Sequence, residues 1–101
     1  MDVLHATEVS FRLGPGTVGD ARAMAADLSA EAEGCRDDML FVDAETGVYG
    51  YLALWAGRAE AEAFAARPAV REQIAALEKR IGTPPTVRHY TVERPGGARE
   101  P

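Results

Sequence analysis

Three aromatic side chains in the stretch GVYGYLALWAG, residues 47–57, could do chemistry together. Tyr49, Tyr51 and Trp55 stand two and four residues apart, so in an extended strand all three lie on one face. Phenolic hydroxyls can hydrogen-bond an oxygen anion, and an indole can stack on an aromatic ring. The pattern predicts a site for an aromatic ligand, and packing in a core or a dimer interface is the alternative for each residue.

The two histidines, His5 and His89, are the natural candidates for a general base, because histidine exchanges its proton near neutral pH. His5 falls on the apolar face of its predicted strand, the face expected to meet helices. A structural histidine is the alternative reading for both. The predicted substrate-binding residues are Tyr49, these two histidines, Arg88 next to His89, and Phe64 on the helix after the aromatic stretch.

These residue types could support an oxygenation without a cofactor. An electron-rich phenol can reduce dioxygen once it is deprotonated, so the protein must supply one base and a dry aromatic pocket. Tyr51 or Tyr49 would hydrogen-bond the phenolate, and Trp55 would stack on its ring. Trp55 and Tyr51 are therefore expected to share one cavity that also admits solvent or ligand.

No metal or flavin is expected. Cys35 is the single cysteine, so it has no second thiol with which to form an internal disulfide or a metal-binding pair. The tandem acids Asp37 and Asp38 have no neighbouring histidine, and nothing near the cysteine would lower its pKa. The sequence also lacks a glycine-rich phosphate loop.

The composition of the chain limits the kinds of partner and the compartment that can be expected. A chain of 101 residues with 47% hydrophobic and 27% charged residues is typical of one small globular domain. A formal net charge of −5 argues against nucleic acid as a partner. No apolar run approaches the roughly 20 residues that cross a bilayer, and residues 1–5 lack the features of a signal peptide, so a cytoplasmic protein is expected.

Glycine and proline divide the chain into six elements. The predicted strands are residues 3–13, 38–43, 47–57 and 86–93. The predicted helices are residues 17–33, which end at Gly34, and residues 58–81, which are interrupted at Pro68. Thr17 and Asp20 are spaced like a capping pair. Residues 1–94 form the predicted domain, and residues 95–101 are expected to be a disordered tail.

The element order is strand, helix, strand, strand, helix, strand, which predicts an α+β, ferredoxin-like fold with a four-stranded antiparallel sheet. Helices cover one face of such a sheet. Leu52 and Leu54 are expected to face the helices, which would leave Tyr49, Tyr51 and Trp55 on the uncovered face. An apolar face of that size usually meets a partner or a ligand.

The run GCRDDMLFVDAETGVYGYLALWAGRAEAEAFAARPAV, continuing to TPPTVRHYTV, resembles the antibiotic biosynthesis monooxygenase family of dimeric α/β barrels. The shared features are a glycine after the first helix, a hairpin whose second strand ends in tryptophan, a helix rich in Glu and Ala, and a last strand after a double proline. The resemblance covers residues 3–94. It implies a homodimeric barrel in which each subunit holds a pocket between its sheet and its helices.

The resemblance also implies a reaction. Family members include oxygenases that oxidise anthrones and quinols without metal or flavin, and enzymes that degrade haem. The family tryptophan corresponds to Trp55, the family asparagine to Tyr51, and the family helix tyrosine to Ala61. Trp55 and Tyr51 are therefore the predicted catalytic residues, and residues 58–81 contain no histidine to bind haem.

Three classes of function stay open. The first is a monooxygenase that combines dioxygen with a small aromatic substrate of polycyclic or quinol type. The second is a non-oxygenase relative, either a lyase or isomerase on a small cyclic compound or a binding protein. The third is a haem-degrading enzyme, for which the expected helix histidine is missing.

Overall fold

The computed structural model describes residues 3–96. In order, its elements are β1 (Leu4–Arg12), α1 (Val18–Ala30), β2 (Asp37–Asp43), β3 (Val48–Trp55), α2 (Arg58–Ala66), α3 (Pro68–Ile81) and β4 (Thr86–Val92). The predicted order is confirmed, and each boundary lies within a few residues of the predicted one. Of the predicted tail, residues 95 and 96 form a turn and the rest lies outside the described residues.

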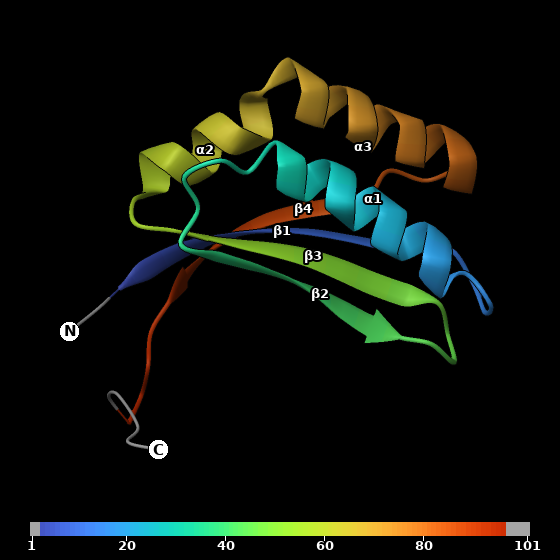
Figure 1. Cartoon of the computed structure of the whole chain (residues 1–101), viewed down its shortest axis with the longest axis horizontal. Helices are drawn as coiled ribbons and strands as arrows, with labels where there is room; N and C mark the ends of the chain where they lie inside the picture. Colours follow the sequence, from blue (N-terminus) through green and yellow to red (C-terminus); the bar gives the residue numbers. More distant parts are fainter. Residues whose placement is uncertain (1–2, 97–101) are drawn as a thin grey trace.

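The four strands form one antiparallel sheet in the order β2-β3-β1-β4. All three helices lie against one face of this sheet, and the other face is left open (Figure 1). The α+β, ferredoxin-like fold is therefore confirmed. Within residues 3–96, no helix is both long enough and apolar enough to cross a bilayer.

The second helical segment is two helices because of Pro68. A residue before proline is pushed towards extended backbone, and Arg67 has φ −62° and ψ 134°. Pro68 then occupies the first turn of α3, where a missing N–H costs nothing. The break turns α2 to lie over β1 and β3 near the end of the sheet where β3 terminates (Figure 1).

The predicted orientation of the aromatic face was wrong. Tyr49, Tyr51 and Trp55 are 1%, 2% and 3% exposed, and two of them contact Phe64 of α2. Leu52 and Leu54 lie half-buried on the open face instead. The physical reason is volume, because α1 and α2 bury three small side chains, Ala21, Ala25 and Ala61. Large side chains from β3 fill the space that these alanines leave.

The open face of the sheet nevertheless carries large apolar side chains that are exposed. Phe41, Val48 and Tyr90 on this face are 50%, 43% and 40% exposed. Phe41 lies opposite Gly50 across the β2–β3 ladder, and a Cβ at Gly50 would come 3.3 Å from the Phe41 ring. The ring therefore lies over the glycine on the open side of the sheet.

The predicted capping pair at the start of α1 was also wrong. Thr17 occupies the N-cap position but makes no capping bond. Its hydroxyl donates to the carbonyl oxygen of Gly14 at 2.6 Å and lies 2.9 Å from the Tyr49 hydroxyl. Asp20 instead accepts a hydrogen bond from Arg80 of α3 at 2.8 Å. The Thr17 side chain thus forms a hydrogen bond with the buried Tyr49 and does not cap the helix.

Candidate functional site

Six of the seven predicted site residues lie on the helix-covered face of the sheet or on the helix above it. His5 is the cross-strand partner of Trp55, and His89 is the partner of Thr7, so both histidines share the face of the buried aromatics. Arg88 pairs with Glu8 on the open face. The side chains of Arg88 and His89 therefore lie on opposite faces of the sheet, as those of neighbouring strand residues do. The structure does not bring Arg88 together with the two histidines.

Trp55, Phe64 and Tyr51 form one packed aromatic group beneath α2. The ring centroids of Trp55 and Phe64 are 5.3 Å apart, and those of Tyr51 and Phe64 are 6.4 Å apart, both in tilted arrangements. Such geometries are favourable for aromatic pairs. Tyr49 lies at the other end of β3, where its ring is 5.8 Å from Phe11. Tyr49 is therefore separated from the group around Trp55.

The Tyr51 hydroxyl is held by residues that the sequence did not single out as its partners. It donates to Asp38 Oδ2 at 2.8 Å, and the Ser29 hydroxyl donates to the same oxygen at 2.5 Å. Burial, together with the bond to Asp38, raises the pKa of the Tyr51 phenol far above its usual value. The phenol is a neutral donor that already has its acceptor.

The predicted cavity shared by Trp55 and Tyr51 was wrong, because Tyr51 is buried under the helices and lines none of the three main hollows of the described residues. Cys35 lies near this group, and burial followed by the charges of Asp38 and Asp37 raises the pKa of its thiol. The thiol therefore stays protonated and weakly reactive.

Two hollows lie beside α2, one on each side of the helix. We call the first the histidine recess, with a volume of about 140 Å³ and lined by His5, Arg58, Ala61, His89, Tyr90 and Thr91. It lies between the start of α2 and the strands β1 and β4. This recess brings both predicted histidines together with Arg58, a residue that the sequence analysis did not select.

The tautomer of His89 is assigned from its contact with Thr7. Thr7 is fully buried, and its hydroxyl donates its single proton to the carbonyl oxygen of Ala61 at 3.3 Å. The hydroxyl oxygen of Thr7 itself lies 3.4 Å from His89 Nδ1. With the hydroxyl proton directed to Ala61, we assign the hydrogen in this contact to His89 Nδ1. The lone pair of neutral His89 is then on Nε2, where it can accept a proton.

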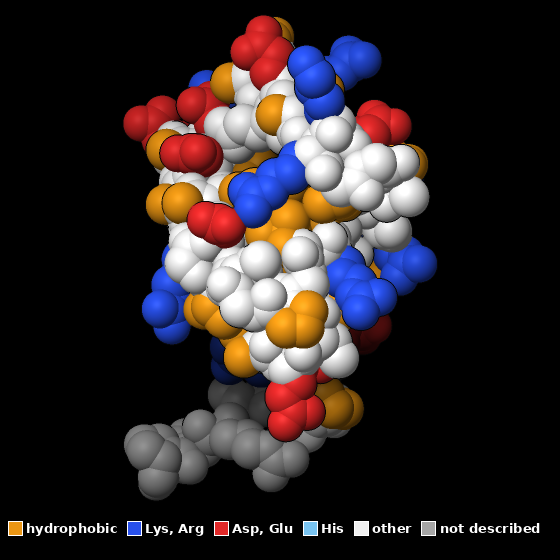
Figure 2. All heavy atoms as spheres, turned by 90° about the vertical axis from the view of Figure 1, so that its right-hand side faces the viewer, with side chains coloured by type: hydrophobic (Ala, Val, Ile, Leu, Met, Phe, Trp, Pro, Cys, Tyr) orange, Lys and Arg blue, Asp and Glu red, His pale blue; other side chains and the backbone are white. Residues whose placement is uncertain are grey.

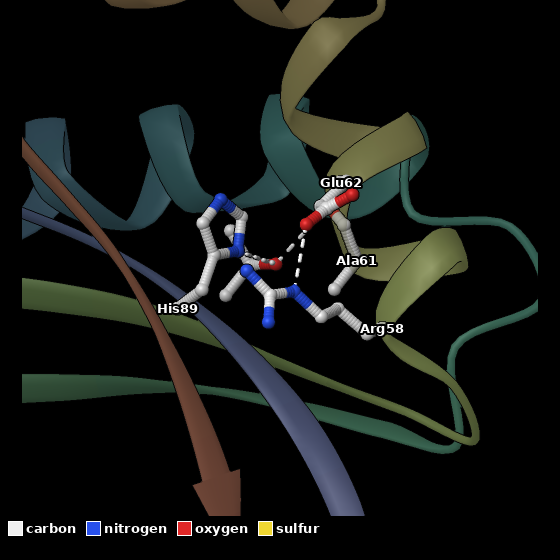
Figure 3. Close-up of polar contacts among 5 residues, drawn as sticks. Arg58, Ala61, Glu62 and His89 are labelled. Atoms are coloured by element: carbon white, nitrogen blue, oxygen red, sulfur yellow. Dashed lines mark hydrogen bonds and ion pairs between the residues drawn. The ribbon is translucent and has the colours of Figure 1, made fainter.

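Arg58 supplies the positive charge of this recess. Its Nε donates to Glu62 Oε1 at 2.8 Å, an ion pair one helical turn apart whose side chains are 75% and 55% exposed. Arg58 also lines the recess, and Figure 3 shows its guanidinium extending from α2 toward His89. An anionic oxygen in the recess would meet this guanidinium and the ring of His89 together.

We call the second hollow the glutamate recess, with a volume of about 210 Å³. It lies between α2 and the segment that follows α1, and it is lined by Glu31, Glu33, Trp55, Glu60, Ala63, Phe64 and Arg67. Within residues 3–96, the buried Nε1–H of Trp55 finds no acceptor. An unpaired buried donor costs about 1–3 kcal/mol and is uncommon.

A third hollow of about 270 Å³ runs between α1 and α3, lined by Met24, Asp27, Leu28, Gln73, Ala76, Leu77 and Arg80. Figure 2, which views the end where α1 begins and α3 ends, shows apolar side chains exposed between charged ones. No predicted site residue reaches this groove in the described part of the chain. In residues 3–96, no group of three His, Cys, Asp or Glu side chains is arranged to hold a metal ion.

Comparison with known proteins identifies the fold class. No family model and no curated protein matches the sequence, whereas several solved structures match the fold. Rv0793 from Mycobacterium tuberculosis is 18% identical with a TM-score of 0.69, and the match covers 90% of this chain and 96% of that one. A protein named as a putative antibiotic biosynthesis monooxygenase from Caulobacter crescentus is 17% identical, with a TM-score of 0.67 and 92% of both chains covered.

A third match is to a variant of SnoaB, a cofactor-independent oxygenase from Streptomyces nogalater. It is 18% identical with a TM-score of 0.58, and the match covers 94% of this chain and 95% of that one. At these identities the likeness shows the fold. The chain thus has the fold of the antibiotic biosynthesis monooxygenase structures, as the sequence resemblance predicted.

Proposed function

We propose that this protein is a cofactor-independent monooxygenase that acts on a small quinol-type aromatic compound in the histidine recess. The observation that carries the proposal is the hydroxyl of Thr7, which leaves His89 Nε2 as a proton acceptor beside the Arg58 guanidinium. The shared fold with a structure described as a cofactor-independent oxygenase supports the same class of reaction.

The proposed reaction begins with proton transfer. His89 Nε2 takes the phenolic proton of the quinol, and Arg58 stabilises the phenolate that forms. The phenolate passes one electron to dioxygen, which gives a semiquinone radical and superoxide. These combine at a ring carbon that bears hydrogen, and the resulting peroxide loses water. One oxygen atom enters the ring as a hydroxyquinone, and the other leaves in water, so the reaction needs no further reductant.

The size of the recess favours a substrate with one ring. Drug-sized ligands occupy pockets of roughly 300–1,000 Å³, whereas the histidine recess has about 140 Å³. Ala61 lines it where the resemblance places a tyrosine, and the Trp55 indole lies behind it as the cross-strand neighbour of His5. We assign Trp55 and Tyr51 to the wall that supports the recess. His89, His5 and Arg58 are then the groups that meet the substrate.

We also propose a homodimer formed through the open face of the sheet. Phe41, Val48 and Tyr90 on that face are exposed in the single chain, and large apolar side chains exposed on one face of a sheet favour an interface. Light scattering is expected to give twice the mass of the chain, and Phe41→Asp should shift the protein towards the monomer. A wild-type monomer at micromolar concentration would contradict this part of the proposal.

A second candidate function is proton transfer alone, as in an isomerase or lyase on a cyclic ketone. The exposure of His89 and Tyr90 favours it, because radical chemistry with dioxygen requires a site closed to water. A cyclic ketone would then exchange its α-hydrogens with deuterium from solvent without any uptake of oxygen. For the first candidate, a change in the conformation of α2 would have to close the recess, because the proposed dimer interface is on the other face of the sheet.

An oxygen electrode tests the oxygenase directly. A methyl-substituted hydroquinone should drive oxygen uptake above its spontaneous rate, while its dimethyl ether, which has no phenolic proton, should not. With ¹⁸O₂, one labelled atom should appear in the quinone product. Uptake that His89→Gln leaves unchanged, or a product without the label, would contradict the proposed reaction.

A further inference from the structure

The lining of the glutamate recess carries an excess of negative charge. Arg67 is paired with Glu31, since its Nη2 lies 3.2 Å from Glu31 Oε1 and its Nη1 donates to the carbonyl oxygen of Glu31 at 2.8 Å. Glu33 and Glu60 make no ion pair with any other residue of the described range. Three carboxylates thus face one guanidinium, and two of the three remain available to a cation.

The inner wall of the same recess is aromatic. Trp55 and Phe64 both line it, and their ring centroids are 5.3 Å apart with the rings inclined at 40°. An aromatic wall attracts an organic cation through the ring quadrupole, and indole is the strongest of the aromatic side chains in this respect. Carboxylates at the rim above such a wall favour an ammonium group over a neutral group of the same shape.

The unpaired indole N–H is a second and independent indication of a ligand. Trp55 is 3% exposed, and its Nε1–H finds no acceptor among residues 3–96. Its neighbour Tyr51, also buried, has its hydroxyl paired with Asp38. Buried donors in proteins are almost always satisfied. A molecule in the recess whose hydroxyl or carbonyl oxygen displaces the side chains covering Trp55 Nε1 would supply the missing acceptor.

We propose that the glutamate recess binds a small organic cation, an ammonium group that carries a hydroxyl or carbonyl oxygen a few bonds away. Glu33 and Glu60 hold the ammonium group, Trp55 and Phe64 provide the apolar wall, and Trp55 Nε1–H donates to the oxygen. The site lies on the opposite side of α2 from the histidine recess. It does not depend on the proposed oxygenation.

The first test uses choline and its neutral isostere 3,3-dimethylbutan-1-ol. Trp55 is the single tryptophan of the chain, so its fluorescence reports on this recess without any label, and calorimetry provides a second readout. Choline should bind saturably with a dissociation constant on the order of millimolar, and at least about tenfold more tightly than the neutral alcohol. Equal affinity for the two compounds, or no binding of choline by either method, would overturn the proposal.

Charge variants locate the binding. The double variant Glu33→Gln with Glu60→Gln should weaken choline binding by about five- to tenfold. Its matched control is Glu72→Gln with Glu78→Gln, which removes the same charge from exposed positions on α3. Loss of affinity in both double variants alike would show a general effect of net charge and would overturn the assignment to the recess.

The indole N–H tests the oxygen contact separately. A single tryptophan gives a single indole N–H resonance, and choline should move it downfield as the hydroxyl accepts its proton. Tetramethylammonium has the same cationic head without the oxygen and should move the resonance clearly less. Equal movement by the two cations would overturn the assigned contact between the ligand oxygen and Trp55 Nε1–H.

Discussion

The histidine recess and the glutamate recess lie on opposite sides of α2 and differ in the elements that face them. β1 and β4 contribute His5 and His89 to one, while the end of α1 and the loop after it contribute Glu31 and Glu33 to the other. The inner walls are neighbours, because His5 and Trp55 are partners across the β1–β3 ladder. One short helix thus separates a basic hollow from an acidic one.

The difference arises because α2 presents different side chains on its two sides. Arg58 and Ala61 line the histidine recess, whereas Glu60, Ala63 and Phe64 line the glutamate recess. Successive helical residues are 100° apart, so neighbours in the sequence lie on different flanks. The histidine recess is suited to stabilise an anion formed within it, and the glutamate recess is suited to hold a cation. Variants that affect one recess and spare the other test this separation.

The largest effect is expected from His89→Gln. Glutamine can still bond to Thr7 but cannot accept a proton, so turnover of the hydroquinone should fall by about 10²- to 10⁴-fold. Choline binding, followed through Trp55 fluorescence, should stay within twofold of the parent. A variant that keeps the parent rate would remove His89 from the mechanism, and a matching loss of choline binding would show that the recesses are coupled.

Phe64→Ala should damage both recesses, because Phe64 packs on Trp55 and Tyr51 at the partition between them. Truncating a buried phenylalanine lowers the free energy of unfolding by about 3–5 kcal/mol, which denaturant titration can measure. Phe11→Ala is the matched control, since Phe11 is also buried but contacts Tyr49. It should cost similar stability while sparing choline binding in the fraction that remains folded.

The sequence predicted the elements well because local chemistry specifies them. Gly34, Gly47 and Gly82 take positive φ where the chain turns or a helix stops, and Pro68 divides the second helical segment. Period-two spacing correctly grouped Tyr49, Tyr51 and Trp55 on one face. The spacing could not show which face of the sheet the helices cover, because side chains on both faces repeat with the same period of two. The alanines at 21, 25 and 61 were the available signal, since small helix residues require large partners from the sheet.

The candidate site was less predictable because it depends on strand register and helix placement. The contact between Thr7 and His89 joins residues 82 apart in the sequence, and it exists because β1 and β4 pair in one particular register. The bond from Tyr51 to Asp38 likewise depends on the β2–β3 register. Arg58 was missed since nothing in the sequence places the first turn of α2 beside β4.

Tyr51→Phe should have a smaller effect, about 1–2 kcal/mol at pH 7, because it removes one hydrogen bond to the carboxylate of Asp38. The raised pKa of Tyr51 in the folded protein gives this difference a pH dependence. Above about pH 10 the unfolded phenol ionises while the folded phenol keeps its proton. Stability present below pH 10 is then lost as pH rises, by up to about 1.4 kcal/mol per pH unit.

The measurement is chemical denaturation of the parent and the variant between pH 7 and pH 11. The parent should lose stability above pH 10 more steeply than Tyr51→Phe, so the gap between the two should narrow. Turnover of the hydroquinone should stay within about twofold, because Tyr51 supports the wall and does not meet the substrate. Parallel stability curves would contradict the raised pKa, and a large loss of turnover would return Tyr51 to the catalytic group.

The smallest expected effect comes from two glutamates of α2 that stand two residues apart. Glu62 pairs with Arg58 at the histidine recess, whereas Glu60 lines the glutamate recess. Glu62→Gln should change the free energy of unfolding by less than about 0.5 kcal/mol, since exposed ion pairs contribute little. Without its partner, the guanidinium of Arg58 should hold a phenolate more strongly, so KM for the hydroquinone should fall about two- to threefold. Glu60→Gln should leave KM unchanged and weaken choline binding. Glu62→Gln should lower KM and leave choline binding unchanged. If each substitution altered KM and choline affinity equally, α2 would not separate two independent sites. The charges on its two sides would then influence both recesses together.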